Sequence, residues 1–147
     1  MTMPTYFTLK ELLKSNTAEA QGIDNTPTWK VVDNLRDLTD TILDPLRAAW
    51  GGPIRVTSGY RCELLNTAVG GTPTSVHKRG SAADIKPSGK GTFTEFKDFV
   101  VKWFKSTGTK FDQLLIERNA KTGDMWLHIG QYNNNGQQRG QIKFMEI

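Results

Sequence analysis

The chain has 147 residues, of which 37% are apolar, and its 19 Lys and Arg against 15 Asp and Glu leave a net charge of +4. A chain of this length can bury roughly 68–70% of its unfolded surface, so its core needs neither disulfides nor a structural metal. The single cysteine, Cys62, excludes an intrachain disulfide and zinc sites built from paired cysteines. A charge of +4 suits an anionic partner, but it is modest for a nucleic-acid binder, and we expect no nucleic-acid partner.

The first predicted elements are helices. The segment TLKE, at residues 8–11, has the spacing of a capping box and starts a short helix that ends near Ser15. The polar stretch 18–27 is predicted to form a loop. From Thr28, apolar residues recur at helical spacing, which predicts a long amphipathic helix that breaks at Pro45 and ends at the next pair of glycines. We expect its apolar stripe to face the core.

The remainder of the chain is dominated by short β-branched or alternating segments typical of strands. They are residues 54–58, 82–85, 114–117, 125–130 and 141–145, with helices predicted over 62–69 and from Phe93 to a stop at Gly108. Helices come first and strands dominate later, which indicates the α+β class. We therefore predict a single domain over residues 1–147, in which N-terminal helices pack on a small, mainly antiparallel sheet.

The N-terminal segment has no basic region followed by an apolar run, and no stretch approaches the ~20 apolar residues of a membrane span. We expect no signal peptide and no membrane insertion.

The two histidines of the chain, His77 and His128, are the first candidates for chemistry. His77 precedes Asp84 by seven positions across Gly80, which lets the backbone reverse and bring the two side chains together. His128 lies in an apolar strand, WLHIG, where an imidazole needs a partner. Two His and one Asp are the ligand set of a catalytic zinc site, which keeps its fourth position for water. Alternatively, His77 and Asp84 form a hydrogen-bonded pair and His128 is an unrelated core histidine.

A hydrolytic zinc site also needs a carboxylate that moves a proton from water to the leaving group. Glu117 is the first candidate, because it ends a strand that would pair with the strand of His128 across a hairpin. Asp124, four positions before His128, is the alternative, although we expect it at the hairpin turn, pointing to solvent.

Two further side chains bear on the site. Arg61 follows a strand end and could project its guanidinium into the same cleft, where it would hold a substrate carboxylate through two parallel hydrogen bonds. Alternatively, Arg61 pairs with an acid and fixes its loop. Cys62 has no evident partner histidine, and we interpret it as a structural thiol and not as a nucleophile.

Taken in order, these motifs resemble those of the zinc D-alanyl-D-alanine carboxypeptidase family, peptidase M15, including its bacteriophage endolysin members. The resemblance runs from Ser58 to Gly130 and rests on Ser-Gly-Tyr-Arg at 58–61, Ser-x-His-x-x-Gly-x-Ala-x-Asp at 75–84, Glu117 and Trp-x-His at 126–128. It implies the hedgehog/DD-peptidase fold.

The resemblance also implies roles for individual residues. These are zinc binding by His77, Asp84 and His128, general-base catalysis by Glu117, and contributions to substrate binding from Arg61, Ser75 and Trp126. In many family members the base lies three residues before the last histidine, where this chain has Met125. The related hedgehog domain instead places its glutamate on the preceding strand, and Glu117 is similar to that arrangement.

The function that the resemblance implies is zinc-dependent hydrolysis of an amide bond in peptidoglycan, as a carboxypeptidase or an endopeptidase, without a covalent intermediate. The expected partner is the stem peptide, and the expected oligomeric state is a monomer. A phage or prophage lysis enzyme of this kind would be made in the cytoplasm of the bacterial host and reach the wall from the periplasm after holin-type release. The alternative is a non-catalytic, zinc-containing wall-binding module of the same fold.

Overall fold

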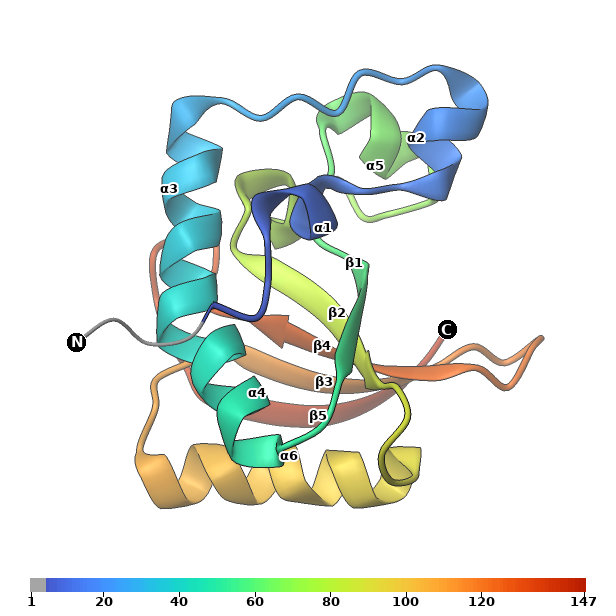
Figure 1. Cartoon of the computed structure of the whole chain (residues 1–147). Helices are drawn as coiled ribbons and strands as arrows, with labels where there is room; N and C mark the ends of the chain where they lie inside the picture. The colour runs from blue at the N-terminus through green and yellow to red at the C-terminus, as the bar shows by residue number, and fades with distance from the viewer. Residues whose placement is uncertain (1–4) are drawn as a thin grey trace.

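The computed structural model describes residues 5–147, and residues 1–4 of the predicted domain lie outside the described range (Figure 1). The helices are α1 (Leu9–Leu13), α2 (Asn16–Gln21), α3 (Trp29–Leu38), the π-helical turn η1 (Thr39–Leu43), α4 (Asp44–Trp50), α5 (Glu63–Ala68), the 3₁₀ turn η2 (Val76–Arg79) and α6 (Phe93–Thr107). The strands are β1 (Ile54–Ser58), β2 (Ala82–Pro87), β3 (Gln113–Arg118), β4 (Met125–Gly130) and β5 (Gln141–Glu146).

The strands form one five-stranded sheet in the order β1-β2-β4-β3-β5. All neighbouring pairs are antiparallel except β3 and β5, which are parallel. In Figure 1, α6 runs beneath the sheet, α3 and α4 stand at its side, and α1, α2 and α5 lie above it. The predicted α+β class with a mainly antiparallel sheet is therefore confirmed.

One hydrophobic core joins the helices to the sheet. The apolar stripe that starts at Val31 is buried, as predicted, and meets α6 and the inner face of the strands. The fully buried residues of this core include Leu35, Leu38, Ile42, Leu46, Phe96, Ile85, Leu127 and Ile129. Among residues 5–147, no helix combines the length and the apolar character that crossing a bilayer would need.

The predicted loop over 18–27 is partly wrong, because α2 covers its first residues. The Ser15 side chain accepts a hydrogen bond from the Ala18 backbone N–H and so caps the helix start, and Gly22 ends the helix in the left-handed conformation at φ 66°. Ala18 is buried. A single buried alanine gives no apolar periodicity, and for this reason the short helix escapes detection from the sequence.

The long helix after Thr28 is interrupted earlier than predicted. The α-helical pattern ends at Leu38, a π-helical turn follows, and Pro45 lies in the first turn of α4 and not at the break. Proline lacks an N–H and its ring clashes with the carbonyl four residues earlier. The wider turn over Thr39–Leu43 precedes the proline and has the Asp44 N–H bonded to the Thr39 carbonyl.

Candidate active site

The register of the sheet places the predicted site residues on one face. Asp84 of β2 pairs with His128 of β4, and Glu117 of β3 pairs with Trp126 of β4. Directly opposed residues in antiparallel strands share a face, and residues two apart on one strand do so as well. Asp84, His128, Trp126 and Glu117 therefore project from the same side of the sheet. The hairpin argument from the sequence predicted this closeness for Glu117 and His128.

His77 reaches this face from the turn η2. Gly80 ends the turn at φ 73°, a left-handed conformation that glycine adopts without strain. A Cβ atom at Gly80 would lie 2.9 Å from the Val31 carbonyl oxygen, so the turn packs directly on α3. The chain then returns at once into β2, which brings His77 next to Asp84.

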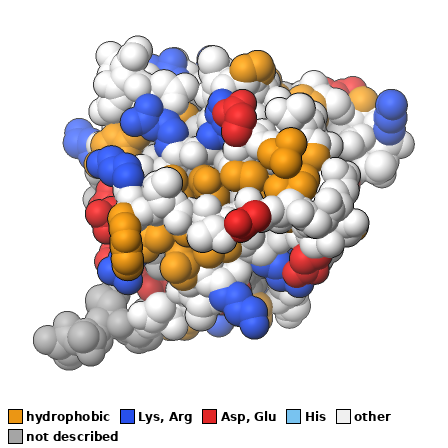
Figure 2. Space-filling view, turned by 90° about the horizontal axis from the view of Figure 1, so that it is seen from above, with side chains coloured by type: hydrophobic (Ala, Val, Ile, Leu, Met, Phe, Trp, Pro, Cys, Tyr) orange, Lys and Arg blue, Asp and Glu red, His pale blue; other side chains and the backbone are white. Residues whose placement is uncertain are grey.

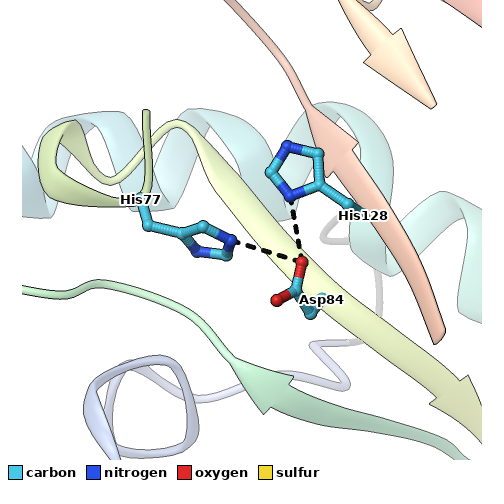
Figure 3. Close-up of side chains that lie close together, drawn as sticks. All are labelled: His77, Asp84 and His128. Carbon is cyan, nitrogen blue, oxygen red and sulfur yellow. Dashed lines mark hydrogen bonds and ion pairs between the residues drawn. The ribbon is translucent and has the colours of Figure 1, made fainter. Parts of the chain in front are cut away.

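Three side chains converge at this point (Figure 3). His77 Nε2 lies 3.2 Å and His128 Nδ1 lies 3.0 Å from the same oxygen, Asp84 Oδ1. Each of the three residues offers one ligand atom, and these atoms all lie within 4.8 Å of one another. The group could hold one metal ion. Of the two interpretations of the sequence, the structure thus disagrees with the one in which His77 and His128 are unrelated.

The orientation of His77 fits a bound cation. Its Nδ1 lies 2.7 Å from the Gly59 carbonyl oxygen, which can only accept, so Nδ1 carries the hydrogen. Burial lowers the pKa of His77 and favours the neutral ring. Nε2 is thereby left facing Asp84 Oδ1, where it can donate to the carboxylate when the ring is charged or serve as a metal ligand when the ring is neutral. A backbone carbonyl that fixes the ring in this way is the usual support of a metal-binding histidine.

The charges of the group are coupled. Burial by itself would raise the pKa of Asp84, but the adjacent His77 and His128 hold the pKa of this carboxyl well below its usual range. Burial opposes a proton on His128, yet the hydrogen bond to Asp84 and its negative charge raise the pKa of the His128 ring. Asp84 is therefore a carboxylate at neutral pH, which is the form that a metal ion requires.

A cavity of about 680 Å³ opens over these three residues, and its wall contains Glu117 and Trp126. The indole Nε1–H of Trp126 donates to Glu117 Oε1 at 3.0 Å. Burial raises the pKa of the Glu117 carboxyl, and the charge of Asp84 raises it further, against the opposing effect of the indole hydrogen bond. A fixed carboxylate with a raised pKa beside a potential metal site has the properties of a general base.

Asp124, the alternative base, lies elsewhere. It is exposed at the β3–β4 turn, as expected, and forms an ion pair with Lys86. Asp124 is not among the residues that line the cavity over the three potential ligands. The geometry therefore favours Glu117.

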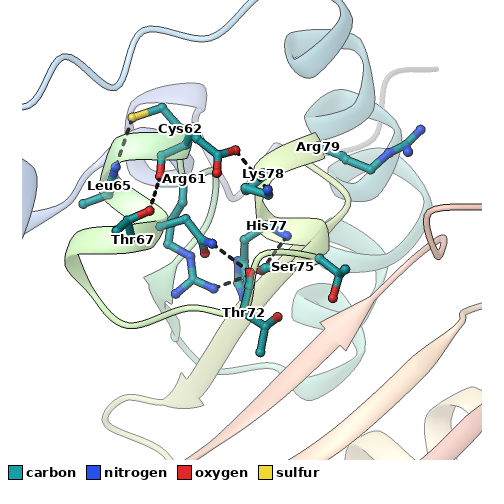
Figure 4. Close-up of polar contacts among 12 residues, drawn as sticks. Arg61, Cys62, Leu65, Thr67, Thr72, Ser75, His77, Lys78 and Arg79 are labelled. Carbon is teal, nitrogen blue, oxygen red and sulfur yellow. Dashed lines mark hydrogen bonds and ion pairs between the residues drawn. The ribbon is translucent and has the colours of Figure 1, made fainter.

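Arg61 reaches the cavity beside His77 (Figure 4). Its main-chain N–H donates to the His77 carbonyl at 3.1 Å, and its Nη2 donates to Ser75 Oγ at 3.2 Å. Among residues 5–147, no acid lies within ion-pair distance of Arg61, and its buried Nε has no hydrogen-bond partner. The alternative in which Arg61 pairs with an acid is therefore not what the structure shows. Its guanidinium remains available to a carboxylate from outside.

Cys62 belongs to the structure of the next helix. It precedes α5, and its Sγ accepts a hydrogen bond from the Leu65 N–H at 3.4 Å. The thiol does not line the cavity that contains the two histidines. This packing agrees with the interpretation of Cys62 as a structural residue.

One ion pair beside the potential ligands was not predicted from the sequence. Arg139 binds Asp112 in a bidentate manner, with Nε 2.8 Å from Oδ1 and Nη2 2.9 Å from Oδ2, and its backbone N–H adds a third bond at 3.1 Å. Both residues line the cavity. They are 27 positions apart in a stretch without periodic pattern, so no local signal connected them.

The family comparison agrees with this geometry. A family model described as Peptidase M15 matches residues 5–120. The chain belongs to the peptidase M15 family. The match includes Arg61, Ser75, His77, Asp84 and Glu117 and ends before His128. The pairing of β2 with β4 places His128 opposite Asp84. No match was found among curated proteins. This M15 chain is accordingly a peptidase with a group of residues that could bind a metal.

Proposed function

We propose that this peptidase binds one zinc ion through His77, Asp84 and His128 and hydrolyses an amide bond in the stem peptides or cross-links of peptidoglycan. The observation that carries the proposal is the convergence of the three ligand atoms within 4.8 Å, beneath a cavity whose wall contains Glu117. Two imidazoles and one carboxylate suit zinc better than calcium or magnesium, which prefer shells of oxygen.

His77, Asp84 and His128 would hold the zinc ion, which would supply a Lewis acid for the scissile carbonyl and the attacking water. Glu117 accepts the proton of the attacking water and passes it to the departing amine. The Trp126 indole keeps the carboxylate turned toward the cavity through its 3.0 Å hydrogen bond. Arg61, held by Ser75 through Nη2, offers the remaining N–H groups of its guanidinium to a carboxylate of the substrate.

We also propose that the protein acts in lysis by a phage or prophage and reaches the wall from the periplasm after release by a holin. The likeness of its motifs to those of endolysins supports this role. The modest net charge of +4 suits an anionic wall polymer. On the face shown in Figure 2, Lys and Arg side chains lie around the margin of a hydrophobic band and do not form a stripe across it.

Digestion of purified peptidoglycan tests the proposal. The wild-type protein should release peptide fragments, and a chelator should abolish their release until zinc is restored. Fragment masses would distinguish removal of a terminal D-alanine from opening of a cross-link. Binding to the wall without any cleavage would favour the non-catalytic wall-binding module, and cleavage that survives metal removal would exclude the zinc mechanism.

Substitution of the two candidate bases refines the test. Glu117→Gln should lower the turnover number by a factor of about 10² to 10⁴ while one zinc ion per chain remains bound. Asp124→Asn is the matched control, because it removes a carboxylate of the same hairpin outside the cavity, and it should retain wild-type turnover. The reverse result would move the role of base to Asp124.

A further inference from the structure

A second cavity adjoins the proposed active site. It has a volume of about 480 Å³ and shares Arg61 and Val69 with the first cavity. One wall is formed by the end of α1 and the start of α2, and the other by residues 55–58 of β1. We call it the β1-edge cavity.

The lining of this cavity shows how it runs along the sheet. Arg55 and Val56 precede the register shift of β1 between Val56 and Ser58, and consecutive residues in a regular strand point to opposite faces. A cavity lined by both residues, and by Thr57 and Ser58 after them, therefore follows the edge of the strand and not one of its faces. Because β1 is the first strand in the sheet order, this edge has no neighbouring strand among residues 5–147. An extended peptide can bind such an edge through main-chain hydrogen bonds.

The charges around the β1-edge cavity favour an anionic occupant. Its basic side chains are Lys14, Arg55 and Arg61, and its acid is Glu11, whose carboxylate is engaged in the capping box of α1. Lys14 already pairs with Glu19 at 3.7 Å, so Arg55 and Arg61 are the cations that would attract an anion. Arg55 is exposed and takes part in none of the ion pairs among residues 5–147. A carboxylate on a bound peptide would complement these cations.

We propose that the substrate groove continues past Arg61 into the β1-edge cavity and binds there a second, extended peptide arm of the substrate that carries a free carboxylate. This inference rests on the proposed function and deepens it. A groove that continues on both sides of Arg61 accommodates a branched, cross-linked peptide. The enzyme would therefore act as an endopeptidase on cross-links and prefer them to single stem peptides.

The test compares two soluble substrates prepared from purified peptidoglycan with a muramidase: disaccharide-peptide monomers and cross-linked dimers. The wild-type enzyme should show a lower KM for dimers than for monomers. Arg55→Ala should lower kcat/KM for dimers about tenfold relative to monomers, through KM with kcat nearly constant, because a charged hydrogen bond made equally in the ground and transition states is lost. Arg55→Lys should recover part of the preference.

Arg36→Ala is the matched control, since it removes an exposed arginine of α3 that lines neither cavity. The same ratio of dimer to monomer kcat/KM in the wild type and in Arg55→Ala would overturn the inference. If the wild type cleaves neither substrate, the proposed function fails, and calorimetric titration with dimers then decides the inference alone. Weaker dimer binding by Arg55→Ala than by the wild type would support it, and equal or absent binding would overturn it.

Discussion

Gly59 connects the packing of the N-terminal helix to the orientation of a potential zinc ligand. A Cβ atom at this position would lie 2.2 Å from the Leu12 carbonyl oxygen and 2.9 Å from Leu12 Cα, and both are backbone atoms that cannot rotate away. The adjacent Tyr60 N–H donates to the same Leu12 oxygen at 2.8 Å. The Gly59 carbonyl accepts the Nδ1–H of His77 at 2.7 Å. Gly59→Ala should therefore disturb both contacts at once.

The size of the effect follows from these distances. Real Cβ contacts stay above 3.0 Å, so α1 and the segment after β1 must separate by about 0.8 Å in a close-packed interior. That movement breaks or lengthens two hydrogen bonds worth about 1 kcal/mol each, and residual crowding adds to the loss. We expect the metal-free protein to lose about 2–4 kcal/mol of unfolding free energy. Loss of the carbonyl support of His77 should weaken zinc binding by roughly 10- to 100-fold.

Two measurements check this prediction. Urea unfolding in the presence of a chelator gives the stability of the metal-free protein, and competition with a chromophoric chelator gives the zinc dissociation constant. Gly22→Ala is the control, because Gly22 has φ +66° and a Cβ there meets nothing within 4 Å. It should cost about 1 kcal/mol through backbone strain alone and leave zinc binding unchanged. Wild-type zinc affinity in Gly59→Ala would refute the proposed support of His77.

Two other substitutions test the site and its rim. Trp126→Phe keeps an apolar wall but removes the indole hydrogen bond that opposes the burial-driven rise in the Glu117 pKa. We expect kcat to fall about tenfold and the acid limb of the kcat/KM profile to move to higher pH. An unchanged pH profile would contradict a positioning role for Trp126. The hydrogen bonds from Arg139 hold the pKa of Asp112 below its usual value. The pair therefore contributes its full stabilisation above the unfolded-state pKa of about 3.9. This stabilisation is lost as the pH falls through the lower folded-state pKa. Asp112→Asn should be less stable at pH 7 and lose less stability than the wild type on acidification, as measured by urea midpoints between pH 7 and pH 2; parallel curves would contradict this reasoning.

Part of the site could be predicted because its elements are close in sequence. The turn at Gly80 brings His77 to Asp84 within seven positions, and the β3–β4 hairpin places Glu117 on the same face as His128. In both cases, a short connection leaves few possible registers. The regular alternation of strand residues then fixes which side chains share a face.

Other features could not be predicted because they depend on distant partners. The pair of Asp112 and Arg139 forms across 27 positions, and the parallel pairing of β5 with β3 requires a crossover whose direction no local pattern reveals. The helix α2 was missed because it buries only Ala18, and the π-helical turn because apolar spacing hardly changes when a turn widens by one residue.

The sequence by itself determined the chemistry that is available: two histidines, one well-spaced aspartate, no usable pair of cysteines and a helix-then-strand order. Residue types and short spacings are enough to identify these potential ligands, because composition limits which side chains can bind a metal and a short turn limits how far apart they can lie. Only the tertiary structure decided that, within the described residues 5–147, Arg61 has no acid partner and a second cavity follows a β1 edge that no other strand covers. Those features depend on which surfaces the packed elements leave uncovered.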